Sequence, residues 1–318
     1  MSISTVSRVL NHKGNVNPST RARVEAVLQS SHYTPSAIAR GMMSKSLRTV
    51  AVLTVDMRNP HYARTAYTIE REFSRLGYEV TLCNTGGERD EAAKYLRSVL
   101  EKHADGIVLV GSVFNRIGRD PRVSPLLRTV PVVLANGSLD LPNSYSVLVD
   151  DRHGVALAVE HLLARGHRDI FFVKDLDTDS ARAKRDGFVQ AMEQAGFSGA
   201  AQRVLETPQS LEGGIQAAGQ LLRLHKNCTA VICGEDITAA GVLKGLLRAG
   251  VRVPQDIAVV GYNGSEYARI CEPQLTTVDN KPELVGLLSV RLLASLIEKN
   301  GSCASVTIQP ELLLGQTS

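Results

Sequence analysis

From residue 49 onward the chain repeats one rhythm: a short apolar run, a polar loop, an amphipathic segment and then a glycine. The apolar runs are the predicted strands, at residues 50–55, 80–83, 107–110, 132–135, 170–173, 231–233 and 257–261. The amphipathic segments end at Gly77, Gly166, Gly196 and Gly250, where a helix C-terminus favours a left-handed residue. Continuously apolar strands that alternate with amphipathic helices indicate parallel sheets covered on both faces.

The number of predicted strands suits two doubly wound sheets better than one. Residues 275–278 and a helix over 282–298 are predicted to cross between them. No apolar run approaches the ~18 residues of a membrane-spanning helix. The N-terminus also lacks the basic and then apolar pattern of a signal peptide. We therefore expect an α/β protein of two or three domains that works in the cytoplasm without contacting a membrane.

The sequence offers no pattern typical of catalysis. No glycine-rich phosphate loop follows the first strand, Gly111-Ser112 lacks the Gly-x-Ser-x-Gly elbow, and the eight His residues form no His-Glu-x-x-His motif. The five cysteines are scattered without metal-ligand spacing, and Cys83 and Cys233 end strand-like runs, as small core residues do. We expect a protein that is not an enzyme and has no cofactor, metal or disulfide.

Charge is distributed unevenly along the chain. Residues 1–48 contain seven Lys or Arg and only Glu25 as an acid, whereas the rest carries 29 basic and 31 acidic residues. A basic N-terminal segment on a slightly acidic body is typical of a phosphate-binding module attached to a separate ligand-binding domain. A solvated basic terminus is the alternative.

The first residues predict two helices. Residues 2–11 place apolar side chains on one helical face and Arg8 among small hydroxyl residues on the other. Such a face suits a DNA major groove, because Arg binds guanine while Ser and Thr bind phosphates. Taken alone, the segment could also be an ordinary amphipathic helix. Asn17 and Pro18 then mark the N-cap and first residue of a second helix, followed by an apolar stripe of Val24, Val27 and Leu28.

Three motifs in order carry a resemblance to a known family. Thr-Val-Ser-Arg-Val-Leu-Asn at 5–11, Asn-Pro-Ser-Thr-Arg-Ala-Arg-Val at 17–24 and Tyr-Thr-Pro-Ser-Ala-Ile-Ala-Arg-Gly-Met at 33–42 precede a strand. This order resembles the LacI–GalR family of bacterial transcription regulators, and the resemblance continues nearly to residue 318. It implies two doubly wound subdomains of the periplasmic-binding-protein type, preceded by a small all-α helix-turn-helix headpiece that is incomplete here.

The resemblance also implies domain boundaries and DNA contacts. The expected parts are a partial headpiece at 1–33, a hinge helix and linker at 34–48, an N-terminal effector subdomain at 49–149 plus 279–303, and a C-terminal effector subdomain at 150–278 plus 304–318. Base contacts match Ile3, Ser4 and Arg8, phosphate contacts match Thr5, Ser7, Asn11 and Thr20, and the minor groove is reached by the hinge helix with Ala39 and Met42. Met42 stands where the family usually has a Leu that wedges between base pairs, a role that another long apolar side chain can fill.

One departure concerns the start of the chain. Family members carry a further helix before this point, and Met1 stands where the family usually has Val. Because a GTG codon encodes Val internally and Met at a start, we expect the natural protein to begin upstream and this shorter form to bind DNA poorly. An in-frame upstream helix in the gene would support this expectation, and a stop codon there would contradict it.

Ligands of doubly wound sheets bind outside the carboxyl ends of the strands. The family motifs at these positions imply effector contacts by His61, Tyr62, Asn136, Lys184, Glu235, Asp236 and Asn263. Tyr62 could stack on a ligand ring or simply pack, and Asp236 could accept ligand hydroxyls or simply begin a helix.

Several of these residues depart from the family pattern. Asn136 and Asn263 stand where many members have Asp, which leaves room for an anionic ligand such as a sugar phosphate. Glu235 replaces the usual Asn and acts in the opposite direction. Lys184 replaces an Arg and cannot make its planar two-pronged contact. A sugar and a sugar phosphate both stay open.

The sequence thus predicts a DNA-binding regulator, most simply a repressor, controlled by a small-molecule effector. We expect a homodimer on a near-palindromic double-stranded operator, because two-fold symmetry of the protein matches two half-sites. The chain also lacks the heptad tail of tetrameric members. Closure of the cleft would decide whether paired hinge helices at 37–42 form on DNA. The alternative is a small-molecule binding protein without a DNA role, for which the first 45 residues would have no use.

Overall fold

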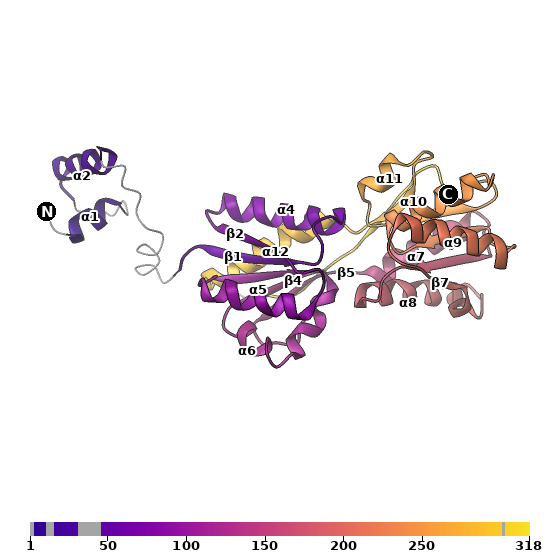
Figure 1. The fold of residues 1–318 in the computed structure, drawn as a ribbon, viewed down its shortest axis with the longest axis horizontal. Coiled ribbons are helices and arrows are strands. Elements are labelled where there is room, and N and C mark those ends of the chain that lie inside the picture. The colour runs from indigo at the N-terminus through magenta and orange to yellow at the C-terminus, as the bar shows by residue number, and fades with distance from the viewer. Residues whose placement is uncertain (1–2, 11–15, 31–45, 301–302) are drawn as a thin grey trace. The chain divides into compact units, whose positions relative to one another are not determined.

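The computed structural model describes residues 3–10, 16–30, 46–300 and 303–318. The chain forms two compact units, Met1–Leu47 and Arg48–Ser318 (Figure 1). None of the helices in these described ranges is long and apolar enough to cross a membrane.

The first unit contains helices α1 (Ile3–Leu10) and α2 (Pro18–Ser30), which contact each other. The Asn17 side chain accepts a hydrogen bond from the backbone N–H of Ser19 at 3.0 Å, which confirms the predicted start of α2. Val9 and Val24 are buried, as expected for the apolar face. Val27, predicted in the same stripe, is 60% exposed.

The described residues of the second unit form two six-stranded sheets. The first sheet is parallel throughout, in the order β11 (Val306–Ile308), β5 (Ser144–Val149), β4 (Val132–Ala135), β3 (Gly106–Val110), β1 (Thr49–Thr54) and β2 (Glu79–Asn84). The second has the order β12 (Glu311–Leu313), β10 (Thr276–Asp279), β9 (Ala258–Tyr262), β8 (Ala230–Cys233), β6 (Ile170–Lys174) and β7 (Val204–Glu206), with only β12 antiparallel. All seven predicted strands are confirmed.

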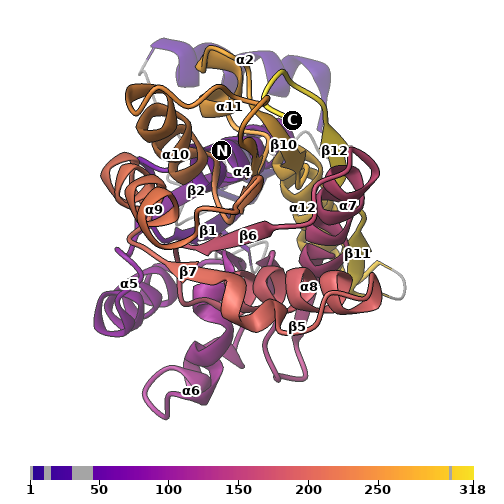
Figure 2. The ribbon, with the colours of Figure 1, turned by 90° about the vertical axis from the view of Figure 1, so that its right-hand side faces the viewer.

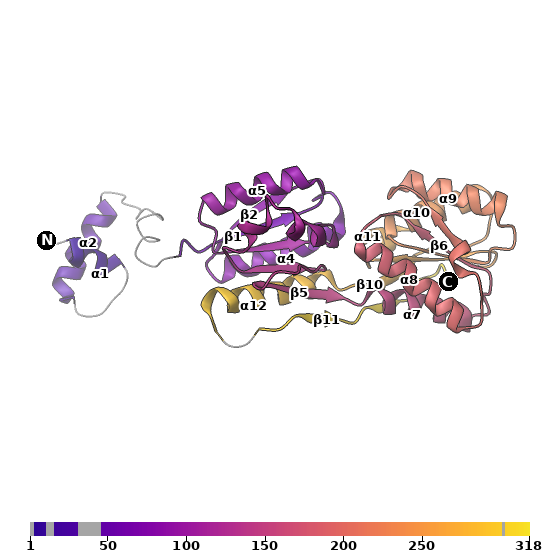
Figure 3. The ribbon, with the colours of Figure 1, turned by 90° about the horizontal axis from the view of Figure 1, so that it is seen from below.

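Helices cover both faces of each sheet, as the apolar strands predict (Figure 3). On the first sheet, α4 (Pro60–Arg75) and α12 (Pro282–Glu298) pack on one face and α5 (Arg89–Glu101) and α6 (Ser124–Leu127) on the other. On the second, α7 (Asp151–Ala164) and α8 (Asp179–Gln194) lie opposite α9 (Leu211–Leu224), α10 (Asp236–Arg248) and α11 (Glu266–Ile270). Figure 2 shows β6 between α8 and α9. We call each sheet with its helices the first lobe and the second lobe.

The glycines predicted to end helices follow α4, α7, α8 and α10, and each has a positive φ, between 78° and 93°. This confirms the prediction, since a residue with a Cβ atom is strained in that conformation.

The chain passes between the lobes after β5, after β10 and after β11 (Figure 3). The third crossing corrects a predicted boundary, because residues 304–318 were assigned as a whole to the C-terminal subdomain. Instead, β11 pairs with β5 in the first sheet, where Ile308 is buried in the same core as Val147. The chain changes lobe only at Gln309-Pro310, between β11 and β12. The remaining domain boundaries stay predictions.

Candidate functional site

Two adjoining cavities lie between the lobes, at the carboxyl ends of the strands. The outer cavity has a volume of about 310 Å³ and the inner cavity about 20 Å³. His61, Glu235 and Asn263 line both. The structure brings together all the predicted effector residues: Tyr62, Asn136 and Lys184 line the inner cavity, and Asp236 lines the outer one.

The first lobe contributes the beginning of α4. Asn59 caps this helix, since its Oδ1 accepts a hydrogen bond from the backbone N–H of His61 at 2.9 Å, and Pro60 occupies the first helical position. This local sequence therefore fixes His61 and Tyr62 in the first turn, at the edge of the cavities. On the same loop, Asp56 pairs with Arg58 at 2.8 Å.

The side chain of Lys184, on α8, contacts groups of the protein itself. Its Nζ donates to the carbonyl of Gly234 at 2.8 Å and to Glu235 Oε1 at 3.3 Å, and lies 4.0 Å from the centroid of the Tyr262 ring. Two of the three donors of the ammonium group are used in these hydrogen bonds, and the group also makes a cation–π contact with the Tyr262 ring. Burial alone would lower the pKa of Lys184, but nearby carboxylates raise it above its ordinary value and keep the side chain charged.

A chain of hydrogen bonds runs from Glu235 to the first lobe. Glu235 Oε2 accepts from Asn263 Nδ2 at 2.5 Å, and Asn263 Oδ1 accepts from Asn280 Nδ2 at 2.8 Å. Asn280 Nδ2 also lies 3.3 Å from Nδ1 of His61. Burial lowers the pKa of His61 to about 3, and the charges of Lys184 and Arg64 act in the same direction. The imidazole is therefore neutral at pH 7, with Nδ1 as acceptor and the hydrogen on Nε2.

Two buried carboxylates beside Lys184 were not predicted from the sequence. Asp151, at the start of α7, accepts from the hydroxyl of Tyr262 at 2.9 Å and from Ser180 Oγ at 2.5 Å. Asp175 accepts from Thr238 Oγ1 at 2.5 Å. Burial raises the pKa of Asp151, and burial together with the charge of Glu235 raises the pKa of Asp175 to about 7. Asp175 lies two residues after the predicted strand at 170–173 and could have been found by its place at a strand end.

The side chains of Asp236 and Tyr62 are buried and contact other groups of the protein. Asp236 is 1% exposed, and its carboxylate accepts from Thr277 Oγ1 and from the backbone N–H of Ser265, each at 2.6 Å. Because it is also the first residue of α10, the geometry favours the helix-start alternative. Tyr62 is 9% exposed and packs in the core of the first lobe, beside Gly111. Packing is therefore favoured over stacking on a ligand.

Asn136 also has a structural partner. It adopts a left-handed conformation with φ of 57°, and its Oδ1 accepts from the backbone N–H of Val149 at 3.2 Å. It thereby holds the end of β5, where the chain leaves the first lobe.

Direct contacts join the lobes beside the cavities. The backbone N–H of Ser180 donates to Ser112 Oγ at 3.1 Å, and Asn115 Nδ2 donates to Asp179 Oδ2 at 2.7 Å. Arg64 of α4 donates to the carbonyl of Gly264 at 2.9 Å. A ligand in the cavities therefore lies next to contacts that a change in lobe closure would alter.

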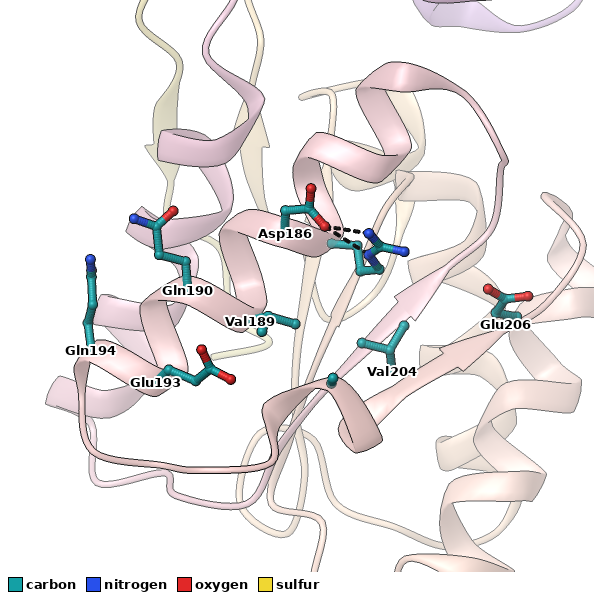
Figure 4. A pocket seen from close by; sticks show the side chains of 9 residues that line it. Asp186, Val189, Gln190, Glu193, Gln194, Val204 and Glu206 are labelled. Carbon is teal, nitrogen blue, oxygen red and sulfur yellow. Dashed lines mark hydrogen bonds and ion pairs between the residues drawn. The ribbon is translucent and has the colours of Figure 1, made fainter.

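A larger groove of about 830 Å³ lies on the outside of the second lobe, between α8 and the edge strand β7 (Figure 4). It contains none of the predicted effector residues. Its Arg185 pairs with Asp186 at 2.6 Å, and its lining comes from one lobe only. Occupation of this groove would not bridge the lobes.

The predicted DNA contacts fall in the first unit. Ile3, Ser4, Thr5, Ser7 and Arg8 lie on α1, where Arg8 is exposed and Thr5 is half-buried. Thr20, on α2, is also half-buried. The side chains of Ile3, Ser4 and Ser7 lie outside the description, as do residues Asn11, Ala39 and Met42 entirely. All these contacts stay predictions.

Comparisons with known proteins place the chain in a family. Residues 1–36 match the family described as "Bacterial regulatory proteins, lacI family", and residues 159–318 match "Periplasmic binding protein-like domain". An HTH-type transcriptional regulator of Lachnoclostridium phytofermentans is 30% identical over 320 residues, which cover 100% of this chain and 96% of the relative. The HTH-type transcriptional repressor PurR of Glaesserella parasuis is 30% identical over 98% of this chain and 92% of its own length.

A solved structure resembles the whole chain. The lac repressor dimer bound to operator and the anti-inducer ONPF is 25% identical, with a TM-score of 0.88 over 100% of this chain and 95% of that one. The chain therefore belongs to the lacI family of bacterial regulatory proteins and is a DNA-binding transcriptional regulator with a ligand-binding domain.

Proposed function

We propose that this protein is a repressor that binds a near-palindromic operator as a homodimer and that a small molecule in the outer cavity controls its DNA binding. One observation carries the control mechanism: the cavity residues Glu235 and Asn263 are hydrogen-bonded through Asn280 to His61. Asn280 lies on the crossing between β10 and α12. The ligand site, a crossing segment and both lobes therefore share one network.

A ligand that bonds to Glu235 or Asn263 would compete with this network and change the balance between more open and more closed lobes. In a dimer that change alters how the two first lobes face each other, and so whether the segments at 37–42 can bind DNA as a pair. A coupling of roughly 1–3 kcal/mol between the two sites is typical and suffices for regulation. The ligand is bound and released without chemical conversion, in keeping with relatives named as transcriptional regulators.

The charges of the cleft favour a sugar over a sugar phosphate. The ammonium of Lys184 is hydrogen-bonded to Gly234 and paired with Glu235, and His61 is neutral. Of the residues described as lining the outer cavity, Arg58 alone is a Lys or Arg, and its side chain is 91% exposed and paired with Asp56. Among the described lining residues, a phosphate in the outer cavity would therefore have only Arg58, already paired with Asp56, as a cationic partner.

Dimerisation and location follow from the same role. The lac repressor structure with which the chain aligns is a dimer on operator, which supports a two-fold symmetric complex here. We place the protein in the cytoplasm, with the chromosome.

Fluorescence anisotropy with labelled genomic fragments tests this proposal. The protein, expressed from the start codon of its gene, is expected to prefer one near-palindromic fragment over random duplex, with one dimer per site. A compound that raises the melting temperature of the protein should change that affinity. The absence of a preference for any fragment, with and without such a compound, would refute the proposed function.

A further inference from the structure

The inner wall of the cleft carries more acids than bases. Asp151, Asp175, Glu235 and Asp236 are all buried around or beside a single buried cation, Lys184. Lys184 forms an ion pair with only one of them, Glu235, at 3.3 Å. The other three rely on hydroxyl and backbone donors, which do not neutralise a carboxylate. The cleft therefore contains more carboxyl groups than cations, and burial raises the pKa of all four acids, so an added positive charge would favour their ionised forms.

A second observation shows an acceptor that lacks its donor. Because ionised Glu235 can only accept, Asn263 must present its Nδ2 to it and its Oδ1 to Asn280. Asn280 must then present Nδ2, which leaves its own Oδ1 as an acceptor. Asn280 is 1% exposed, and among the described residues no group donates to this Oδ1. An unsatisfied buried acceptor is costly unless something occupies the site.

Asn280, Glu235 and Asp175 all line the inner cavity. Its volume of about 20 Å³ holds one group the size of a water molecule. An ammonium group is about this size and has three donors and no acceptor, whereas a hydroxyl has only one donor. The cavity thus offers three acceptors to a group that carries three donors.

The outer cavity adds polar groups from both lobes. From the first lobe, Asp56 and its ion-pair partner Arg58 both line it. The remaining wall presents amide and hydroxyl groups of Gln209, Asn263 and Tyr267, which suit a ligand with several hydroxyls.

We propose that the effector is a polyol carrying an ammonium group, such as an amino sugar, and that Glu235, Asp175 and Asn280 bind that group in the inner cavity. This rests on the proposed function, since it identifies the class of ligand for the same site. The raised pKa of Asp175 agrees with it, because burial and the charge of Glu235 both favour an added positive charge nearby.

Matched pairs of probes test the proposal. Thermal shift and calorimetry would compare glucosamine, galactosamine and mannosamine with glucose, galactose and mannose and with the corresponding hexose phosphates. We expect at least one amino sugar to raise the melting temperature and to bind at least tenfold more tightly than its parent hexose. If none of the amino sugars binds, or if a hexose or hexose phosphate binds more tightly than its amino counterpart, the proposal is wrong.

Variants locate the ammonium group. Glu235→Gln should remove the preference for the amino sugar, whereas Glu193→Gln, on the exposed face of α8 in the same lobe, should retain it. If Glu235→Gln does not fold, Asp175→Asn serves instead: Asp175 lines the inner cavity, its Asn replacement can still accept from Thr238 Oγ1, and the change should weaken amino-sugar binding severalfold but leave hexose binding unchanged. Unaltered preference in the variant that folds would overturn the assignment.

Measurements of operator binding distinguish a failure of the ammonium site from a failure of the proposed function. If a hexose changes operator affinity and no amino sugar does, effector control stands and the ammonium site is wrong. If the protein prefers no genomic fragment, the proposed function is wrong, whatever binds in the cleft.

Discussion

Replacing Asp236 by Asn should change how the stability of the protein depends on pH. In the folded protein burial raises the pKa of Asp236 from 3.8 to about 7. The folded state therefore keeps its proton over a range in which the unfolded state has lost it. The stabilisation linked to that proton is fully present below the unfolded pKa and is lost as pH rises through about 7.

The magnitude follows from the width of that range. Each unit of pKa difference corresponds to about 1.4 kcal/mol, so the two units between about pH 5 and the folded pKa of about 7 account for about 3 kcal/mol in the free energy of unfolding, and the full loss is reached by about pH 8. Asn cannot ionise, and its amide can still accept from the N–H of Ser265 and donate to Thr277 Oγ1, the two present partners of the carboxylate. Asp236→Asn should therefore gain stability relative to wild type by about this amount between those pH values.

Urea unfolding followed by circular dichroism at a series of pH values measures this difference. Comparing variant with wild type cancels the contributions of other groups, including His61, whose pKa of about 3 makes the folded state lose stability on acidification below its unfolded value of 6.5. Asp256→Asn is the control, because Asp256 is paired with Arg252 and its pKa is lowered to about 2. Its stability should differ from that of wild type by a constant amount between about pH 5 and pH 8, and this difference should disappear only in acid. Parallel curves for Asp236→Asn and wild type would refute the reasoning.

Three further predictions concern binding. Arg8→Ala should reduce discrimination between operator and random duplex by about 1–3 kcal/mol, measured by anisotropy, and unchanged discrimination would remove Arg8 from the base contacts. Met42→Gly should weaken operator binding and leave effector affinity intact, while equal operator affinity would exclude a wedge at this position. Asn263→Ala breaks the chain between Glu235 and Asn280 and should abolish the thermal shift produced by the effector, whereas an unaltered shift would place the ligand elsewhere.

Most of the fold could be predicted from the sequence, because central parallel strands are apolar on both faces and helix ends require glycine. The strands that were missed lack this signal. Ser144 and Ser146 interrupt the apolar pattern of β5, and β7, β11 and β12 have only three residues each. Their pairing is determined by neighbours that are distant in the sequence, as β11 with β5 shows. The boundary predicted at 303/304 was wrong for this reason.

The candidate site could be predicted in part. Motifs at strand ends identified the residues that meet in the cleft, because the carboxyl ends of parallel strands share one edge of the sheet. They could not show which side chains are free to contact a ligand. Tyr62, Asp236 and Lys184 all have internal partners in the structure, and Asn280 was hidden in a segment predicted only to cross between lobes.

From the sequence alone, two departures from the family pattern, Glu235 and Lys184, are interpreted as separate changes with separate consequences for the ligand. In that interpretation Glu235 disfavours an anionic ligand, and Lys184 binds one less firmly than Arg does. In the structure they form one buried ion pair, so the charge of Lys184 is compensated by Glu235 and is not available to an anionic ligand. The charge preference of the cleft is therefore determined by the remaining carboxylates, Asp151 and Asp175, for which the described residues provide no second buried cation. A cleft of this kind attracts positive charge, even though its one lysine is the residue that first suggests an anion.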